Sequence, residues 1–149
     1  MKKAFLAVGN SMMGDDGIAS YLGKILEREK AEWKIFDGQD TPESEFHKLR
    51  EYAPDMILVA DAMTGSDIGK LDFIDLSDEI NYMYTTHNLP MPVLLSYLRQ
   101  FCKVVLFLGL NVDIEKVLEI NPQLSQEAKN IAQKALSKID TLDTLFEQK

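Results

Sequence analysis

The segment Gly9-Asn10-Ser11-Met12-Met13-Gly14-Asp15-Asp16-Gly17 contains three glycines and two adjacent acids, and it separates two different apolar patterns. The run at residues 4–8 before it is continuously apolar, as in a buried strand. After it, apolar residues recur at helical spacing, at Ile18, Ala19, Leu22, Ile25 and Leu26. In open α/β sheets, ligands bind at strand-to-helix turns of this kind. We therefore expect an α/β fold with a site at this turn.

The two acids of this turn, Asp15 and Asp16, have two interpretations. Both lie at the start of the predicted helix, where the helix dipole favours negative charge, and an acid there ordinarily caps the helix. A cap needs one carboxylate, so the other is left for chemistry. The glycines allow backbone conformations closed to other residues and bring the backbone close to a ligand.

The rest of the chain alternates between strand and helix patterns, which is typical of α/β proteins. Strands are predicted at residues 33–38, 55–62, 70–75 and 104–109, and helices at 42–52, after Pro90 and from Leu124 onward. We expect residues 1–149 to form a single domain, a three-layer fold in which helices cover both faces of a twisted, mostly parallel sheet.

Composition and charge make several functions unfavourable. The chain has 149 residues, a net charge of −8 and a pI near 4.7, which disfavours binding to nucleic acid and to anionic lipid. No stretch is apolar for long enough to serve as a signal peptide or to insert into a membrane. Cys102 is the single cysteine, so no internal disulfide forms, which fits a cytoplasmic protein. We expect Cys102 to be buried and structural, and His47 to lie on the solvent face of its helix.

Asp15 or Asp16, Asp61 and His87 all fall at element ends that converge at one edge of a parallel sheet. Two carboxylates and an imidazole suit nickel, zinc, iron or manganese better than calcium or copper(I). Three ligands leave coordination positions open for a substrate atom or a water. Simpler interpretations stay open: Asp61 at a strand end can cap the next turn, and His87 can be a hydrogen-bonded loop residue.

An alternative is a binding module of the receiver-domain type. Acids after the first strand and Asp61 at the end of the run 57–60 resemble a pocket that holds magnesium and accepts a phosphoryl group on Asp61. Against this, a glycine loop separates the first acids from their strand, and no lysine follows the strand that ends at Gly109.

The segment from Gly9 to Gly17 strongly resembles the signature of the [NiFe]-hydrogenase maturation endopeptidases, closest to the type that processes the hydrogenase 3 large subunit of formate hydrogenlyase. The likeness continues at Asp37-Gly38, at Asp61-Ala62, in the loop 85–90 and at Gly109-Leu110. In that family, the positions that match Asp16, Asp61 and His87 are taken as the nickel-contacting set.

The resemblance implies a cytoplasmic, aspartyl-type endopeptidase with a hydrogenase-maturation-protease-like domain over residues 1–149. It would remove the C-terminal extension of a [NiFe]-hydrogenase large-subunit precursor after nickel insertion, with the nickel as recognition signal. The precursor supplies the nickel, so no permanent cofactor is expected, although zinc, cadmium or another divalent ion can occupy the same site. Asp16 is the preferred general base because the glycine loop exposes it. We expect a monomer whose catalytic and metal-contacting residues are Asp16, Asp61 and His87.

The sequence also departs from the family pattern. Ala19 stands where a glycine is common, Gln39 follows Asp37-Gly38 where a second glycine is frequent, and Asn111-Val112 replace a Gln-Pro pair. None of these changes removes a proposed ligand. Asp37 lies at a strand end near the other acids, and the pattern leaves open whether it supports the site or only forms a turn.

Overall fold

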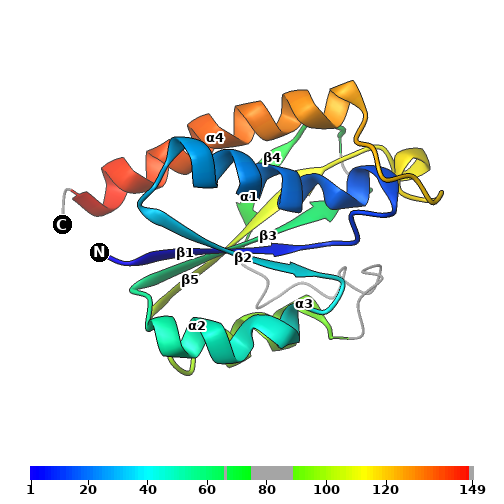
Figure 1. The fold of residues 1–149 in the computed structure, drawn as a ribbon. Helices are drawn as coiled ribbons and strands as arrows, with labels where there is room; N and C mark the ends of the chain where they lie inside the picture. Colours follow the sequence, from blue (N-terminus) through cyan, green and yellow to red (C-terminus); the bar gives the residue numbers. More distant parts are fainter. Residues whose placement is uncertain (66, 75–88, 148–149) are drawn as a thin grey trace.

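A five-stranded sheet forms the centre of the computed structural model, which describes residues 1–65, 67–74 and 89–147 (Figure 1). The strands are β1 (Lys3–Val8), β2 (Trp33–Gln39), β3 (Met56–Met63), β4 (Leu71–Ile74) and β5 (Val104–Asn111). Their order in the sheet is β2-β1-β3-β5-β4. β2, β1, β3 and β5 run parallel to one another, and β4 pairs antiparallel with β5 at the edge. The mostly parallel sheet and the edge strand after Lys70 were both predicted.

Helices cover both faces of this sheet, which confirms the three-layer prediction (Figure 1). α1 (Ile18–Glu29) and α4 (Gln126–Glu147) lie on one face, and α2 (Phe46–Tyr52) and α3 (Met91–Leu98) lie on the other. The short 3-10 helices are η1 (Gly14–Gly17), η2 (Pro42–Glu45) and η5 (Ile114–Lys116). η2 takes the first part of the helix predicted at residues 42–52. α3 begins directly after Pro90, as predicted.

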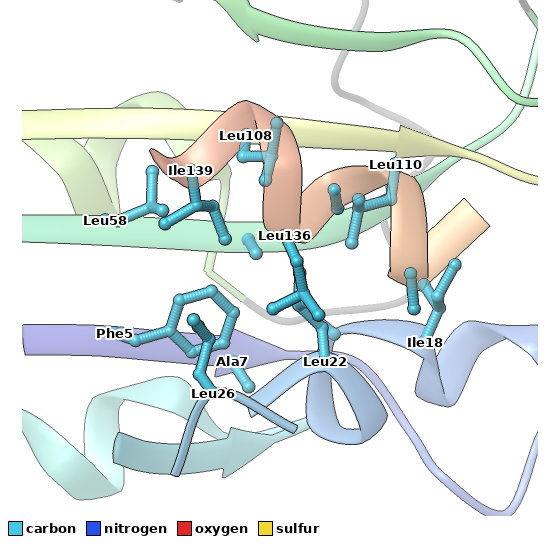
Figure 2. Close-up of a cluster of buried hydrophobic side chains, with 14 of the residues drawn as sticks. Phe5, Ala7, Ile18, Leu22, Leu26, Leu58, Leu108, Leu110, Leu136 and Ile139 are labelled. Atoms are coloured by element: carbon cyan, nitrogen blue, oxygen red, sulfur yellow. The ribbon is translucent and has the colours of Figure 1, made fainter. Parts of the chain in front are cut away.

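The strand side chains divide between two cores. On the first face, Phe5, Leu58 and Leu108 point toward side chains of α1 and α4, including Leu22 and Ile139 (Figure 2). On the second face, the strand residues at the intervening positions pack against α2 and α3; they include Leu6, Val8, Ile57, Val59 and Phe107. β1 and β3 are therefore buried on both sides, which is why their sequences are apolar without alternation.

Two smaller predictions concern side chains away from the sheet edge. His47 lies on the outside of α2 and its side chain is 81% exposed, beside Glu51, which confirms a solvent position. Cys102 is buried, and its thiol donates to the Val104 carbonyl at 3.4 Å. Burial raises the pKa of this thiol above its ordinary value of 9.0, so it is not a ready nucleophile. No helix in the described part of the chain has the length and hydropathy needed to span a bilayer.

Candidate active site

The loop after β1 lies against the end of β3, and Gly9 makes this contact possible. Gly9 has φ +134°, a backbone conformation that residues with a side chain rarely adopt. A Cβ built on Gly9 would collide with the backbone oxygen of Asp16. The same Cβ would lie 3.6 Å from Oδ1 of Asp61. Glycine at position 9 therefore lets the loop fold back so that Asp16 and Asp61 share one neighbour.

Asp61 lies near the end of the central strand β3, where the sequence predicted it. It is in register with Val8 of β1 and with Gly109 of β5, and it is only 2% exposed. Because successive strand residues face opposite sides, Asp61 shares a face with Val59 and Met63 and points toward the α2 and α3 layer. A carboxylate at this depth is shielded from bulk water, so its electrostatic interactions with a neighbouring cation are strengthened.

Asp16 is more accessible than Asp61 and lies in η1, the first turn after the loop. Its Oδ2 accepts a hydrogen bond from the backbone N–H of Asn10 at 2.7 Å. A hydrogen bond between a backbone amide and a carboxylate is charge-assisted, and it holds the side chain in one orientation. Asp16 and Asp61 thus both lie beside Gly9, at the carboxyl edge of the sheet.

Asp15 has a different role from its neighbour. It is 1% exposed, and it accepts hydrogen bonds from the backbone N–H of Ser125 at 2.8 Å and from the Ser125 hydroxyl at 2.6 Å. The Ser125 hydroxyl in turn accepts from the N–H of Ala128 and caps α4. The expected cap on the following helix was wrong, because neither η1 nor α1 has a side-chain cap. Asp15 instead anchors the start of α4.

Asp37 belongs to a network on the opposite face of the sheet from Asp61. It is in register with Ala7, whereas Asp61 is in register with Val8, so the two acids point to opposite sides. Oδ1 of Asp37 accepts from the Ser20 hydroxyl at 2.7 Å, and Oδ2 accepts from the Gln39 amide at 3.0 Å. Asp37 therefore joins β2 to α1 and lies on the opposite side of the sheet from Asp61.

His87, the third predicted member of the site, lies outside the described residues, so its place in the site stays a prediction. Within residues 1–65, 67–74 and 89–147, no three His, Cys, Asp or Glu side chains gather in a way that could hold a metal ion. Of the predicted set, Asp16 and Asp61 lie within the described residues and offer carboxylate oxygens. A nickel or zinc ion would accept such oxygens together with an imidazole, so the donor types fit a borderline metal.

The surface beside the loop carries exposed apolar side chains. Met12 is 53% exposed, and its carbonyl accepts from the N–H of Asn121 at 2.7 Å. The N–H of Gly14 donates to the Asn121 carbonyl, also at 2.7 Å, so the segment before α4 is tied to the loop. This segment also carries large exposed side chains: Ile114 at 54%, Leu118 at 65% and Ile120 at 80%. We call these four residues the apolar rim.

Sequence reasoning missed two features of the site. Ser125 lies 110 positions from Asp15, and no local pattern links the two residues. Gln39 was singled out only as a departure from a family glycine. The structure gives it φ +52°, in the left-handed region that glycine adopts without strain. The replacement of a frequent glycine by Gln39 was the sequence signal that could have indicated this left-handed conformation.

A family model described as HycI, hydrogenase maturation protease, matches residues 18–141. The chain is 38% identical over 117 residues to the Hydrogenase 3 maturation protease of Escherichia coli K12, covering 76% of this chain and 75% of that protein. The solution structure of an endopeptidase HycI from Escherichia coli superimposes with a TM-score of 0.82 at 31% identity, covering 96% and 92% of the two chains. The crystal structure of a Wolinella succinogenes protein gives 0.83 at 49% identity, with 98% and 99% covered.

Proposed function

Since the chain belongs to the hydrogenase maturation protease family, we propose that it removes the C-terminal extension of a [NiFe]-hydrogenase large-subunit precursor once nickel is inserted. The observation that carries this proposal is the juxtaposition of the Asp16 loop and Asp61 around Gly9. The family match covers Asp61 and the position of His87, both within residues 18–141. The family match also favours this function over the alternative phosphoacceptor role for Asp61.

The nickel in this proposal is part of the substrate. Asp16, Asp61 and His87 would contact a metal whose other ligands are thiolates of the precursor, so that only the loaded precursor offers a complete set of contacts. A bound metal of this kind can polarise a carbonyl group or lower the pKa of a water. Recognition of the metal would then make cleavage depend on nickel insertion, and the chain itself would need no resident cofactor.

The two carboxylates would have different roles in the cleavage reaction. Asp61 is almost completely buried, so it is suited to contacting a positive centre in a water-poor setting. Asp16 is partly exposed and is oriented by the Asn10 N–H, so it is the better general base for an attacking water. The site would thereby place a base and a charge-stabilising group on the same scissile bond.

The apolar rim provides a surface for a protein substrate. Met12, Ile114, Leu118 and Ile120 are each more than half exposed and lie on the loop or on the segment bonded to it. Exposed apolar groups that cluster beside a site typically contact a macromolecular partner. We infer that the folded body of the precursor rests on this rim while its C-terminal extension enters between Asp16 and Asp61.

The proposed activity is tested by incubating a C-terminally extended, nickel-loaded large-subunit precursor with the protein and measuring the mass of the products. The wild-type chain should release one C-terminal peptide. Asp61→Asn should release none, whereas Asp55→Asn, which alters an exposed acid bonded to Lys2 at the opposite end of the sheet, should retain cleavage. An unchanged precursor mass with the wild-type chain and a cognate precursor would contradict the proposed function.

A further inference from the structure

Gln39 forms hydrogen bonds with both neighbours of Asn10, the residue whose backbone N–H donates to the Asp16 carboxylate. The Gln39 carbonyl accepts from the N–H of Gly9 at 2.8 Å. Its side-chain Oε1 accepts from the N–H of Ser11 at 3.0 Å and from the Ser11 hydroxyl at 2.8 Å. Asn10 lies between these two anchored residues, so the direction of its own N–H is set by Gln39 from both sides.

The orientation of the Gln39 amide follows from its neighbours. The Ser11 N–H can only donate, so Oε1 must face it, and the Asp37 carboxylate can only accept, so Nε2 must face that group. Nε2 lies 3.0 Å from Asp37 Oδ2 and 3.2 Å from the Ser20 hydroxyl, which itself donates to Asp37. The Gln39 amide therefore bonds to the loop after β1 through Oε1 and to the junction of β2 and α1 through Nε2.

The backbone of Gln39 carries strain that a glycine would avoid. Gln39 and Ala53, with φ +52° and +53°, are the non-glycine residues with positive φ among those that the structure describes. Ala53 ends α2, where a left-handed residue is a common helix terminus. Gln39 ends β2 beside a register shift opposite Ala7 and Val8. Strain of this kind persists where surrounding interactions over-determine the conformation, and here those interactions are the hydrogen bonds of the Gln39 side chain.

We propose that Gln39 is a positioning residue for Asp16: it fixes Gly9 and Ser11, and through them the Asn10 N–H that orients the Asp16 carboxylate. The proposal deepens the function proposed above and rests on it, because the value of a fixed Asp16 lies in its role at the scissile bond. Gln39 itself lies on the far side of the loop and takes no part in the bond cleavage. Its effect is expected in the rate of the chemical step more than in the binding of the precursor, which the apolar rim also provides.

The test compares Gln39→Gly with Ala53→Gly. Both substitutions relieve a left-handed backbone with nearly the same φ, but only Gln39→Gly removes the side-chain bonds to Ser11. Both variants should keep or raise Tm. Gln39→Gly should lower kcat for precursor cleavage by about tenfold or more, because small misplacement of a catalytic group has large rate effects. KM should change less than kcat, since the apolar rim is intact and the Asp16 contact alone is displaced. Ala53→Gly should match the wild-type chain in both constants.

A second measurement does not depend on proteolysis. Hydrogen exchange of the Asn10 amide, followed by NMR, should accelerate by about tenfold or more in Gln39→Gly and remain unchanged in Ala53→Gly, because loss of the anchor frees the loop. Wild-type kcat and an unchanged Asn10 amide in Gln39→Gly would overturn the proposal. So would a loss of activity that parallels a loss of Tm, since that result indicates a purely structural residue. If the wild-type chain cleaves no precursor, the proposed function fails, and the Asn10 amide still decides whether Gln39 positions the loop.

Discussion

Asp15 binds both the backbone N–H and the hydroxyl of Ser125, at 2.8 and 2.6 Å, and so fastens the first turn after β1 to the start of α4. The next residue, Asp16, points to the Asn10 amide and the edge of the sheet. Two adjacent acids therefore serve different ends: Asp15 joins distant segments of the fold, and Asp16 remains for the site. Substitution of each acid in turn separates these two roles.

Replacing Asp15 should affect stability more than chemistry. Asp15→Asn loses one of the two acceptor oxygens that Ser125 uses, and the group is almost fully buried. We expect a loss of about 2 kcal/mol in the free energy of unfolding and a fall in Tm of roughly 6 °C. Chemical denaturation measures this directly. Ser125→Ala should cost a similar amount, and the double variant should cost less than the sum of the two, because both remove the same contact. Additive losses would mean that the two residues act separately.

Replacing Asp16 or Asp61 should affect cleavage more than stability. Asp16→Asn and Asp61→Asn preserve side-chain shape but remove the negative charge, and each should abolish precursor cleavage while Tm stays within a few degrees of the wild-type value. His87→Ala is expected to behave in the same way. The measurement is product mass together with thermal unfolding of each variant. Normal cleavage by His87→Ala would remove His87 from the proposed set.

Much of this site could be predicted because its residues lie at element ends. The continuous apolar run before Asp61 indicates a central strand, and a parallel strand ends at the edge where ligands bind. The roles of Asp15 and Asp37 could not be predicted in the same way. Asp37 and Asp61 both lie near the carboxyl ends of their strands, but the register pairs one with Ala7 and the other with Val8, so they face opposite sides. Register is a property of the assembled sheet, and a slip of one residue would reverse the assignment.

A side chain at position 9 should disrupt the loop that brings Asp16 to Asp61. Gly9→Ala introduces a Cβ that collides with the Asp16 backbone, at φ +134°. We expect a loss in the free energy of unfolding of more than about 3 kcal/mol, because the backbone must move. Gly69→Ala is the matched control: Gly69 also has positive φ, +92°, but a Cβ there meets nothing within 4 Å. Equal destabilisation of the two variants in urea would show that strain alone, and not the close approach, determines the cost.

The apolar rim should contribute to substrate binding. A charged side chain on an apolar contact surface must be desolvated on binding, so Met12→Glu and Leu118→Glu should each raise KM for the precursor by about tenfold while leaving kcat nearly unchanged. Ala31→Glu adds the same charge at an exposed position between α1 and β2 and should leave KM unchanged. Steady-state cleavage assays supply both constants. An equal rise in KM for all three variants would indicate general charge repulsion and exclude a specific role for the rim.

Cys102 should be dispensable for cleavage. Because burial raises its pKa above 9.0, the thiol stays protonated near neutral pH and should react slowly with iodoacetamide in the folded chain. Above pH 9 the unfolded chain loses this proton before the folded chain does, so the raised pKa makes the folded state progressively less stable as pH rises. Cys102→Ala should retain precursor cleavage, and its free energy of unfolding should fall less steeply above pH 9 than that of the wild-type chain. Rapid alkylation of the folded wild-type chain at pH 7 would contradict the assignment.

The sharpest test of the proposed function is whether cleavage depends on nickel in the precursor. Precursor of one preparation is divided into nickel-loaded and nickel-free portions, each is incubated with the wild-type chain, and the masses of the products are compared. A metal-gated endopeptidase releases the C-terminal peptide from the loaded portion alone. Equal cleavage of both portions would contradict the claim that Asp16, Asp61 and His87 recognise the metal carried by the substrate.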